Sequence, residues 1–198
     1  MTTSTLALPR RAVLADAIPG DRVRDAALIL TGALFMAVMA QIAIPVPGSP
    51  VPITGQTLGV VLCGATLGAN RGVTSMLLYV AMGLFLPVYS DGGSGFEHLW
   101  GATGGYIIGF VLATYAVGWL AERGADRRVA VAFASFVVGQ LIVFGIGVPW
   151  LKVWADGSWA NAIHDGFTIF IVGGLVKAAV AAAIVPGAWR FVRKLEER

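Results

Sequence analysis

The residue with the clearest chemical role is Lys177, a single lysine in the middle of an otherwise apolar stretch near the end of the chain. It lies about eleven residues inside the helix expected there, a depth of roughly 16 Å at 1.5 Å per residue. An ammonium group at that depth costs at least about 2.5–3.5 kcal/mol unless it faces a polar cavity or a partner. Its stem is too short to reach the nearest interface. Lys177 is therefore predicted to bind a carboxylate that enters from outside.

Two uncharged polar side chains, Gln56 and Thr57, follow a stretch that contains four prolines within residues 45–52. Each proline fixes its own φ angle and biases its predecessor away from helix, so this stretch is expected to be stiff and extended. Irregular backbone beside apolar helices is tolerated at a membrane only where protein buries it or where it borders a cavity. Gln56 can donate and accept at once, which suits an amide or ureido group. Thr57 suits either a ligand contact or a helix N-cap. We interpret the stretch as the wall or lid of a binding site.

A glycine-rich loop over residues 89–102 holds two acidic residues and no lysine or arginine. Glycines such as Gly93 allow the backbone to approach a ligand closely. The loop lacks the Gly-Lys-Ser/Thr sequence of a nucleotide-binding P-loop. The side chains of Tyr89, Trp100 and Tyr106 offer flat apolar faces with a polar tip. The loop is therefore expected to be a lid over a pocket, with a mobile surface loop as the alternative.

The remaining acidic and metal-ligating residues form no recognisable catalytic or metal-binding pattern. Asp91, Asp165 and the other loop acids are expected to be mostly solvated. His98 and His164 belong to different loops and lack the spacing of metal ligands. Cys63 lies in an apolar stretch and is expected to be a small buried hydrophobic residue. We therefore expect neither a metal site nor an enzyme.

The composition predicts an integral membrane protein. Of the 198 residues, 57% are hydrophobic and 13% are charged, whereas a soluble domain carries about 25% charged residues. One domain is the natural expectation for this length. The pI of about 9.4 and the net charge of +3 are better explained by basic loops on the cytoplasmic side of a membrane than by binding to nucleic acid.

Six apolar segments are expected to form an all-α membrane domain over residues 25–189, between a cytoplasmic N-terminal tail (1–24) and a basic cytoplasmic tail (190–198). The segments cover residues 26–44, 58–69, 73–88, 103–121, 129–151 and 167–185. A helix needs roughly 20 apolar residues to cross a bilayer, so the second segment is too short to cross upright. A tight turn is expected after it at residues 70–72, and Pro186 is expected to end the sixth helix.

The basic residues predict the topology of these segments. With the N-terminus in the cytoplasm and six crossings, the inside segments hold 12 of the 14 lysines and arginines, as the positive-inside rule requires. They are Arg10, Arg11, Arg22, Arg24, Arg71, Arg123, Arg127, Arg128, Arg190, Arg193, Lys194 and Arg198. Three loops then face outward, at residues 45–57, 88–102 and 152–165. The tryptophans in and beside the last loop favour the headgroup level, which suits an interfacial hairpin or half-helix.

Ala33 and Ala37 stand four residues apart on the first apolar segment. Small residues at this spacing let helix backbones approach closely in lipid. Packing within the chain is one interpretation of the pair. Contact with a partner protein is the other, since the first helix can lie at the edge of the bundle.

Several blocks of the sequence resemble the BioY family. The block Val51-Pro-Ile-Thr-Gly-Gln-Thr57, followed by Gly64-Ala-Thr-Leu-Gly68, closely resembles the signature of that family. Similar blocks occur at residues 83–88, 103–109, 147–151 and 174–177, and the resemblance covers nearly all of residues 26–188. BioY proteins are the biotin-binding S components of energy-coupling factor (ECF) vitamin transporters.

The resemblance implies a six-helix protein of the prokaryotic plasma membrane, which binds biotin, its transported substrate, in an outward pocket without a cofactor. It also implies a partnership with a transmembrane coupling protein and a pair of cytoplasmic ATPases, with Ala33 and Ala37 as the coupling contact. The residues expected to bind the substrate are Lys177, Gln56, Thr57, Tyr89, Gly93, Thr103, Tyr106 and Asp165.

The chain departs from the family pattern at Gly174. The family usually has an acid three residues before the lysine of the sixth helix, suited to pair with that lysine or with the ureido N–H groups. Either Asp165 or Asp91 takes over this role here, or the affinity or ligand choice differs.

The main alternative function is a self-contained secondary transporter or channel for a small carboxylate-bearing solute. Two observations argue against it. Only one ionisable residue is expected in the middle of the membrane, which is few for ion-coupled transport, and the sequence shows no inverted repeat. A membrane enzyme is a third class, which the missing catalytic constellation disfavours.

Overall fold

The computed structural model describes residues 12–196, and most of this part of the chain is helical. The long helices are α1 (Arg22–Gln41), α2 (Gln56–Leu67), α3 (Ala69–Gly83), α5 (Gly104–Ala121), α6 (Val129–Trp154) and α8 (Ile171–Glu196). The short elements are η1 (Leu14–Ala17), β1 (Ala43–Ile44), β2 (Ile53–Thr54), η2 (Ser90–Gly92), α4 (Gly95–Leu99), η3 (Ala125–Arg127), α7 (Trp159–Gly166) and η4 (Thr168–Phe170). The expected helical class is confirmed for the described residues, with one small hairpin added.

Within residues 12–196, four stretches are long and apolar enough to cross a membrane: α1, α5, α6 and the stretch Trp159–Leu195, which contains α7 and most of α8. The apolar helix α2 has 12 residues and α3 has 15. At 1.5 Å per residue these two helices are about 18 Å and 23 Å long, less than the ~30 Å of a hydrocarbon core. The fold is therefore that of a multi-pass membrane protein with two shorter helices inside its bundle.

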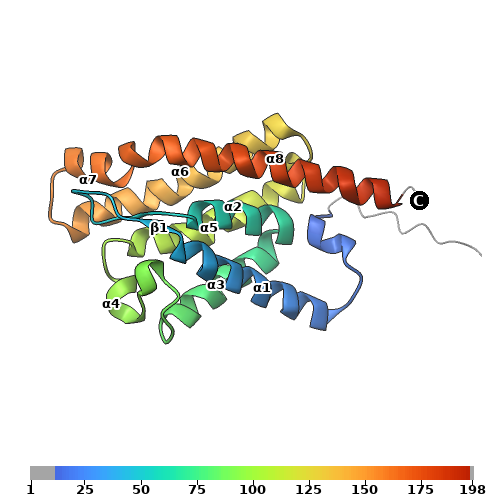
Figure 1. The fold of residues 1–198 in the computed structure, drawn as a ribbon, viewed down its shortest axis with the longest axis horizontal. Helices are drawn as coiled ribbons and strands as arrows, with labels where there is room; N and C mark the ends of the chain where they lie inside the picture. The colour runs from blue at the N-terminus through green and yellow to red at the C-terminus, as the bar shows by residue number, and fades with distance from the viewer. Residues whose placement is uncertain (1–11, 197–198) are drawn as a thin grey trace, which may run out of the picture.

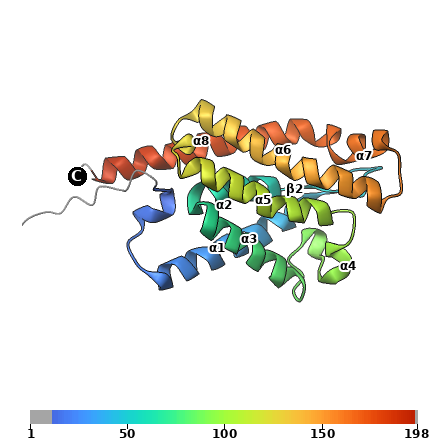
Figure 2. The same ribbon diagram turned by 180° about the vertical axis from the view of Figure 1, so that it is seen from behind.

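The central helix of the bundle is α5, which contacts α2, α3 and α6. Helix α8 packs against α6 and α2, while α1 packs against α3 and α2. Figures 1 and 2 show the result as a layer of α6 and α8 on one side of α2 and α5, with α1 and α3 on the other side. Any cavity bordered by both α2 and α5 consequently lies in the middle of the molecule.

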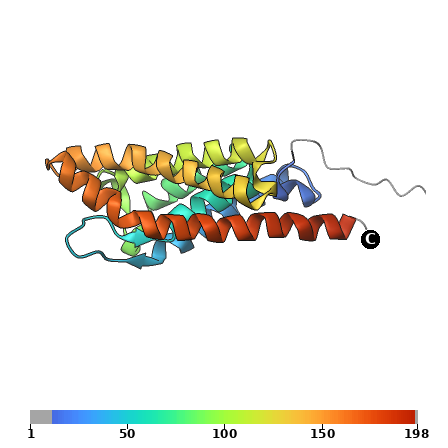
Figure 3. The same cartoon turned by 90° about the horizontal axis from the view of Figure 1, so that it is seen from above.

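The connecting segments divide between the two ends of the molecule. The β1–β2 hairpin, α4 and α7 gather at one end, and the C-terminal end of α8 lies at the other (Figures 1 and 3). The proline-rich stretch forms the loop of the hairpin, in which Ala43 pairs with Thr54 and Ile44 with Ile53. Because proline cannot donate to a strand ladder, the prolines fall outside the paired residues. The three loops predicted to share one side of the membrane therefore lie at one end of the fold.

The turn between α2 and α3 lies earlier than the sequence predicted. It consists of Gly68 alone, whose φ of +83° is favourable for glycine, and α3 starts at Ala69. The predicted turn at residues 70–72 is wrong, because those residues form the first turn of α3. The carboxylate of Glu122 accepts a hydrogen bond from the Ala69 N–H at 2.8 Å and so caps the new helix. A charged residue 53 positions away in sequence thus fixes the start of α3.

Helix α8 continues through Pro186 to Glu196, so the prediction that this proline ends the helix is wrong. A proline inside a helix removes one backbone hydrogen bond, a loss that neighbouring groups can make good in a membrane protein. Residues 190–196 of the predicted basic tail are therefore helical, and residues 197–198 lie outside the described part.

The N-terminal segment is partly ordered where a flexible tail or short helix was expected. Residues 1–11 lie outside the described part, whereas η1 follows directly and α1 begins at Arg22. The guanidinium of Arg71 on α3 forms ion pairs with both Asp16 and Asp25. These contacts hold η1 against the end of the bundle opposite the hairpin.

Candidate binding site

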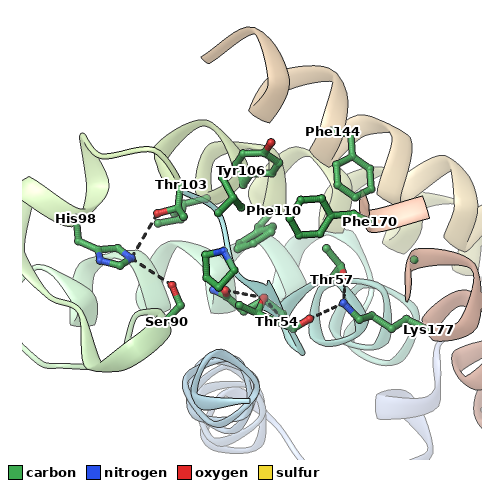
Figure 4. Close-up of a pocket in the computed structure, with 15 residues that line it drawn as sticks. Thr54, Thr57, Ser90, His98, Thr103, Tyr106, Phe110, Phe144, Phe170 and Lys177 are labelled. Carbon is green, nitrogen blue, oxygen red and sulfur yellow. Dashed lines mark hydrogen bonds between the residues drawn. The ribbon is translucent and has the colours of Figure 1, made fainter. Parts of the chain in front are cut away.

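The candidate site is a cavity at the hairpin end of the bundle, with about 550 Å³ of empty space including its open mouth. Its lining residues are Val51, Pro52, Thr54, Gln56, Thr57, Ser90, His98, Thr103, Tyr106, Ile107, Phe110, Phe144, Phe170, Gly174 and Lys177. The hairpin, the glycine-rich loop and helices α2, α5, α6 and α8 all contribute (Figure 4).

Lys177 forms a cationic end of the cavity. Its Nζ donates to the backbone carbonyl of Thr54 and, at 3.1 Å, to the hydroxyl of Thr57. Among residues 12–196, the ion pairs present do not include Lys177. Both of its acceptors are neutral, so the positive charge remains available to an anionic ligand. Residues from the hairpin and α2 therefore hold the ammonium group at the edge of the pocket.

Gln56 also lines the cavity, and its side-chain amide forms two hydrogen bonds within the protein. Its Nε2 donates to the hydroxyl of Tyr79 at 2.9 Å, and its Oε1 accepts from the hydroxyl of Thr54 at 3.0 Å. A glutamine amide has two N–H donors and two acceptor lone pairs. One donor and one lone pair thus remain for a ligand, in an orientation that Tyr79 and Thr54 fix.

A second polar group, formed by Ser90, His98 and Thr103, lies on the other side of the cavity (Figure 4). The Nε2 of His98 is 3.5 Å from the hydroxyl of Ser90 and 3.4 Å from that of Thr103. Burial lowers the pKa of His98, and the nearby charge of Asp91 opposes this shift. The imidazole is therefore neutral at pH 7, and this end of the pocket is polar but uncharged.

The cavity wall between these ends is aromatic and aliphatic. The rings of Tyr106 and Phe110 come from α5, that of Phe144 from α6 and that of Phe170 from η4. Phe144 makes edge contacts with Tyr106, and the hydroxyl of Tyr106 donates to the carbonyl of Gly166 at 2.9 Å. The rings therefore come from three separate elements, and this hydrogen bond ties one of them, α5, to the end of α7.

Of the residues predicted to bind the substrate, Lys177, Gln56, Thr57, Thr103 and Tyr106 line the cavity. The other three are not among the lining residues.

Tyr89, the first residue of the glycine-rich loop, is fully buried, and its hydroxyl donates to the carbonyl of Val80 at 2.8 Å. Asp165 holds the loop of the hairpin, since its backbone carbonyl accepts from the Ser49 hydroxyl at 2.8 Å. Its carboxylate pairs with the imidazole of His164 at 2.8 Å. Neither Asp165 nor Asp91 lines the cavity, so neither supplies an acid beside Lys177.

The predicted set missed the aromatic and aliphatic lining residues other than Tyr106, and three polar ones, Thr54, Ser90 and His98. In a helix that is apolar all round, no periodicity indicates which side faces a cavity. A signal for His98 did exist, because a lone histidine in a loop without lysine or arginine is unusual enough to ask what it contacts. Among residues 12–196, no three His, Cys, Asp or Glu side chains are grouped as they would be around a metal ion.

The structure places Ala33 and Ala37, the pair predicted to contact the coupling protein, differently on α1. Ala33 is completely buried, and Ala37 is half-buried. The exposed side of α1 carries larger apolar side chains, including Leu30, Leu34 and Val38. Ala33 therefore serves packing within the chain in this conformation, whereas Ala37 stands closer to the exposed side.

The space next to Gly174 is occupied by Gln140 of α6. The Nε2 of Gln140 donates to the carbonyl of Gly174 at 2.7 Å, and both residues are buried. A Cβ atom on residue 174 would overlap the Oε1 of Gln140. The side chain that the family carries at this position therefore has no room unless Gln140 moves.

This geometry predicts that Gly174→Ala lowers stability by about 1–2 kcal/mol, because Gln140 must leave its hydrogen bond to make room. Thermal unfolding of the purified protein in detergent measures the change. The neighbouring Gly173→Ala is the control, since a Cβ at residue 173 meets no atom within 4 Å. The double variant Gly174→Ala/Gln140→Ala should recover most of the loss. Equal unfolding temperatures for Gly174→Ala and Gly173→Ala would contradict the overlap at residue 174.

Comparison with known proteins identifies related chains. The family model described as the BioY family matches residues 8–194. The biotin transporter BioY2 of Lactococcus lactis is 35% identical over 152 residues, covering 76% of this chain and 82% of that protein. The biotin transporter BioY of Rhodobacter capsulatus is 36% identical over 182 residues, covering 81% and 90%.

A crystal structure of the S-component for biotin from an ECF-type ABC transporter has the same fold. Its TM-score is 0.77 at 23% sequence identity, and the alignment covers 89% of this chain and 93% of that one. The two chains therefore share their helical arrangement although fewer than a quarter of the aligned residues are identical. With the family model matching nearly the whole chain, this protein belongs to the BioY family.

Proposed function

We propose that this chain is the biotin-binding membrane component of an ECF-type vitamin importer. Its relatives are named biotin transporters, and the fold is that of an S component for biotin. The observation that carries the proposal is Lys177, whose ammonium group faces a largely apolar cavity with no carboxylate partner among residues 12–196. The protein acts by binding and transport rather than by catalysis.

The chemistry of biotin suits the parts of this cavity. Its valerate tail ends in a carboxylate, which Lys177 can bind through a charge-assisted hydrogen bond. Its fused rings are apolar at the sulfur side, and they suit the aromatic wall formed by Tyr106, Phe110 and Phe144. Its ureido group needs a few neutral donors and acceptors. Mostly apolar walls with a few placed polar groups are typical of small-molecule sites.

The proposed topology has six crossings with both chain ends in the cytoplasm, and α2 and α3 form the two short crossings. The positions of the basic residues support it. Arg71 on α3, Arg127 in η3 and Arg193 on α8 belong to segments away from the hairpin end. By the positive-inside rule the hairpin end, with the pocket mouth, then faces outward. The protein is thus proposed to reside in the prokaryotic plasma membrane and to deliver biotin with a transmembrane coupling protein and two cytoplasmic ATPases.

Titration of the purified full-length chain with biotin tests the binding function. Saturable binding is expected, with desthiobiotin as a competitor because it keeps both the ureido group and the carboxylate. Thiamine, a cationic vitamin without a carboxylate, should not compete. No saturation by biotin, or equal displacement by thiamine, would rule the proposed substrate out.

Substitutions on α1 separate packing from coupling. Ala33→Leu should destabilise the protein by about 1–3 kcal/mol, because the residue is fully buried and additional methylenes overpack the core. Ala37→Leu should leave biotin binding intact and reduce ATP-driven uptake in cells that contain the coupling protein and ATPases. Thermal unfolding, biotin titration and uptake are measured for both variants. Unchanged uptake with Ala37→Leu would remove that residue from the proposed coupling surface.

A further inference from the structure

We propose that the end of the molecule opposite the hairpin has a binding site for the phosphate headgroup of an anionic phospholipid. The site is a basic surface formed by five exposed side chains of the α5–α6 turn and the last two turns of α8: Arg123, Arg128, Arg190, Arg193 and Lys194. It lies at the other end of the molecule from the biotin cavity (Figure 1). The inference therefore does not depend on which substrate the chain binds.

The charges at this end of the molecule are divided unevenly between its two sides. On the side of α1 and α3, Arg71 forms ion pairs with both Asp16 and Asp25. On the other side, residues 122–128 and 189–195 contain six basic residues and only two acidic ones. Counting the last three residues of the sequence, two glutamates and one arginine, still leaves seven basic residues against four acidic ones. The excess positive charge is thus concentrated beside α8.

Both acidic side chains of the α5–α6 turn are engaged in other contacts. The carboxylate of Glu122 accepts from the N–H of Ala69 at the start of α3. Asp126 is buried and accepts from the indole N–H of Trp189 on α8. The guanidinium of Arg127 lies over the ring of the same tryptophan, 4.7 Å from its centroid. These contacts bind the turn to α8, and among residues 12–196 the ion pairs present include none of the five exposed basic side chains.

An exposed apolar stripe on α8 runs directly beside these basic residues. It consists of Ile184, Phe191 and Leu195, whose spacings of seven and four residues place them on one face of the helix. Arg190 and Lys194 each precede a member of the stripe by one residue, a rotation of about 100° around the helix. Basic residues beside large apolar ones are typical of helices at the headgroup level. A phospholipid has the same pairing, with a charged headgroup next to an acyl chain.

Helix α8 is long enough to bring this pattern to the membrane surface. Its 26 residues span about 39 Å at 1.5 Å per residue, more than the ~30 Å of a hydrocarbon core. Its C-terminal end projects beyond the α5–α6 turn (Figures 1 and 3). In that turn, the guanidinium of Arg123 lies 3.5 Å from the ring centroid of Trp119, and tryptophan favours the headgroup level. The basic surface is therefore expected at the depth of the lipid phosphates.

The chemistry of this surface favours an anionic phospholipid over other phosphate compounds. Arginine donates parallel hydrogen bonds to phosphate oxygens, and basic residues close to a membrane attract anionic lipids. A zwitterionic headgroup such as phosphocholine carries its own cation, which the surface repels. A free phosphate has no acyl chain to lie against the apolar stripe. Phosphatidylglycerol has both the required charge and the chain.

Native mass spectrometry of the purified full-length chain tests the site. The protein is incubated in detergent with equal amounts of phosphatidylglycerol and phosphatidylcholine that have the same acyl chains. The unmodified chain should retain phosphatidylglycerol in preference to phosphatidylcholine. Arg190→Gln/Lys194→Gln should lower that preference by about tenfold, because each basic residue adds to the attraction. The matched control Arg22→Gln/Lys152→Gln also removes two positive charges, outside the basic surface, and should keep the preference.

Three results would overturn the inference. The first is equal retention of the two lipids by the unmodified chain. The second is an equal loss in the two double variants, since net charge alone would then explain the binding. The third is displacement of the lipid by inorganic phosphate at the same concentration, which would identify a site for the free anion.

A salt series on the unmodified chain tests the same site if Arg190→Gln/Lys194→Gln does not fold. Retention of phosphatidylglycerol should fall as ionic strength rises, because salt screens exposed charges, whereas retention of phosphatidylcholine should stay constant. A preference that salt leaves unchanged would contradict the role of the basic side chains.

Discussion

Replacing Lys177 with methionine should weaken biotin binding by about 30-fold to 1,000-fold, equivalent to roughly 2–4 kcal/mol. Methionine keeps most of the apolar stem and removes the charge, so packing of α8 against α2 is preserved. The loss follows because a carboxylate that enters a largely apolar cavity exchanges water for one cation. The two present acceptors of the ammonium group cannot replace that cation: the backbone carbonyl of Thr54 repels a carboxylate, and the hydroxyl of Thr57 can donate a hydrogen bond but carries no charge. Isothermal titration in detergent measures the effect.

Lys152→Met is the matched control. This lysine lies in the last turn of α6 near the hairpin end and does not line the cavity. Its removal changes the net charge by the same amount, so it reports any general electrostatic attraction of the biotin anion. Equal losses in the two variants would assign the effect to net charge. Unchanged binding in Lys177→Met would remove the lysine from the site.

The cationic end of the site was predictable because burying a charge in an apolar helix is costly. The presence of Lys177 in the cavity wall could be predicted from its position in the chain alone. The same holds for Gln56 and Thr57, which are polar residues next to a proline-rich break between apolar helices. The aromatic wall was not predictable in this way. Phe144 and Phe170 are apolar residues in apolar segments, where the hydrophobic pattern is the same on all sides.

The glycine-rich loop shows a different limit of sequence reasoning. Tyr89 and Gly93 were predicted to contact the ligand, and the loop was correctly placed next to the cavity. The structure puts these two residues one layer behind His98, which is the side chain that lines it. Spacing along the chain indicates which residues come close together, but it does not indicate which of their side chains lines the cavity. That order depends on packing against α3, through the hydrogen bond from Tyr89 to Val80.

Two helix boundaries were predicted wrongly for a related reason. The turn at Gly68 is fixed partly by the carboxylate of Glu122, and α8 continues through Pro186 where its neighbours Val185 and Trp189 are buried in the bundle. Both are tertiary effects that override local signals. Residues 70–72 and Pro186 look like helix ends when only their neighbours in sequence are considered.

The second large effect is expected from Gly118→Ala, which should destabilise the protein by about 3 kcal/mol, the upper end of the range for overpacking. A Cβ atom on residue 118 would lie 2.5–2.7 Å from backbone atoms of Gly68 and Ala69 in the α2–α3 turn. Backbone atoms cannot rotate away as a side chain does, so either α5 or the turn must shift. Thermal unfolding in detergent, followed by tryptophan fluorescence, measures the loss.

Gly145→Ala is the matched control, because it makes the same chemical change in the neighbouring helix α6, where a Cβ atom meets nothing within 4 Å. It should leave stability unchanged or raise it by up to ~1 kcal/mol, since alanine has the higher helix propensity. Similar unfolding temperatures for the two variants would show that the contact between α5 and the turn is not tight. A lower temperature for Gly118→Ala alone would confirm that it is.

The same contact connects the distant end of the bundle to the binding site. Helix α2 begins with Gln56 and Thr57 in the cavity wall and ends at the Gly68 turn, against which Gly118 of α5 packs. The first turn of α5 contains Tyr106, which lies in the opposite wall of the cavity. A shift forced at the turn is therefore carried along two rigid helices, each about 18–27 Å long, to the two sides of the pocket. Gly118→Ala should accordingly weaken biotin binding as well, although residue 118 does not line the cavity, whereas Gly145→Ala should leave the affinity unchanged.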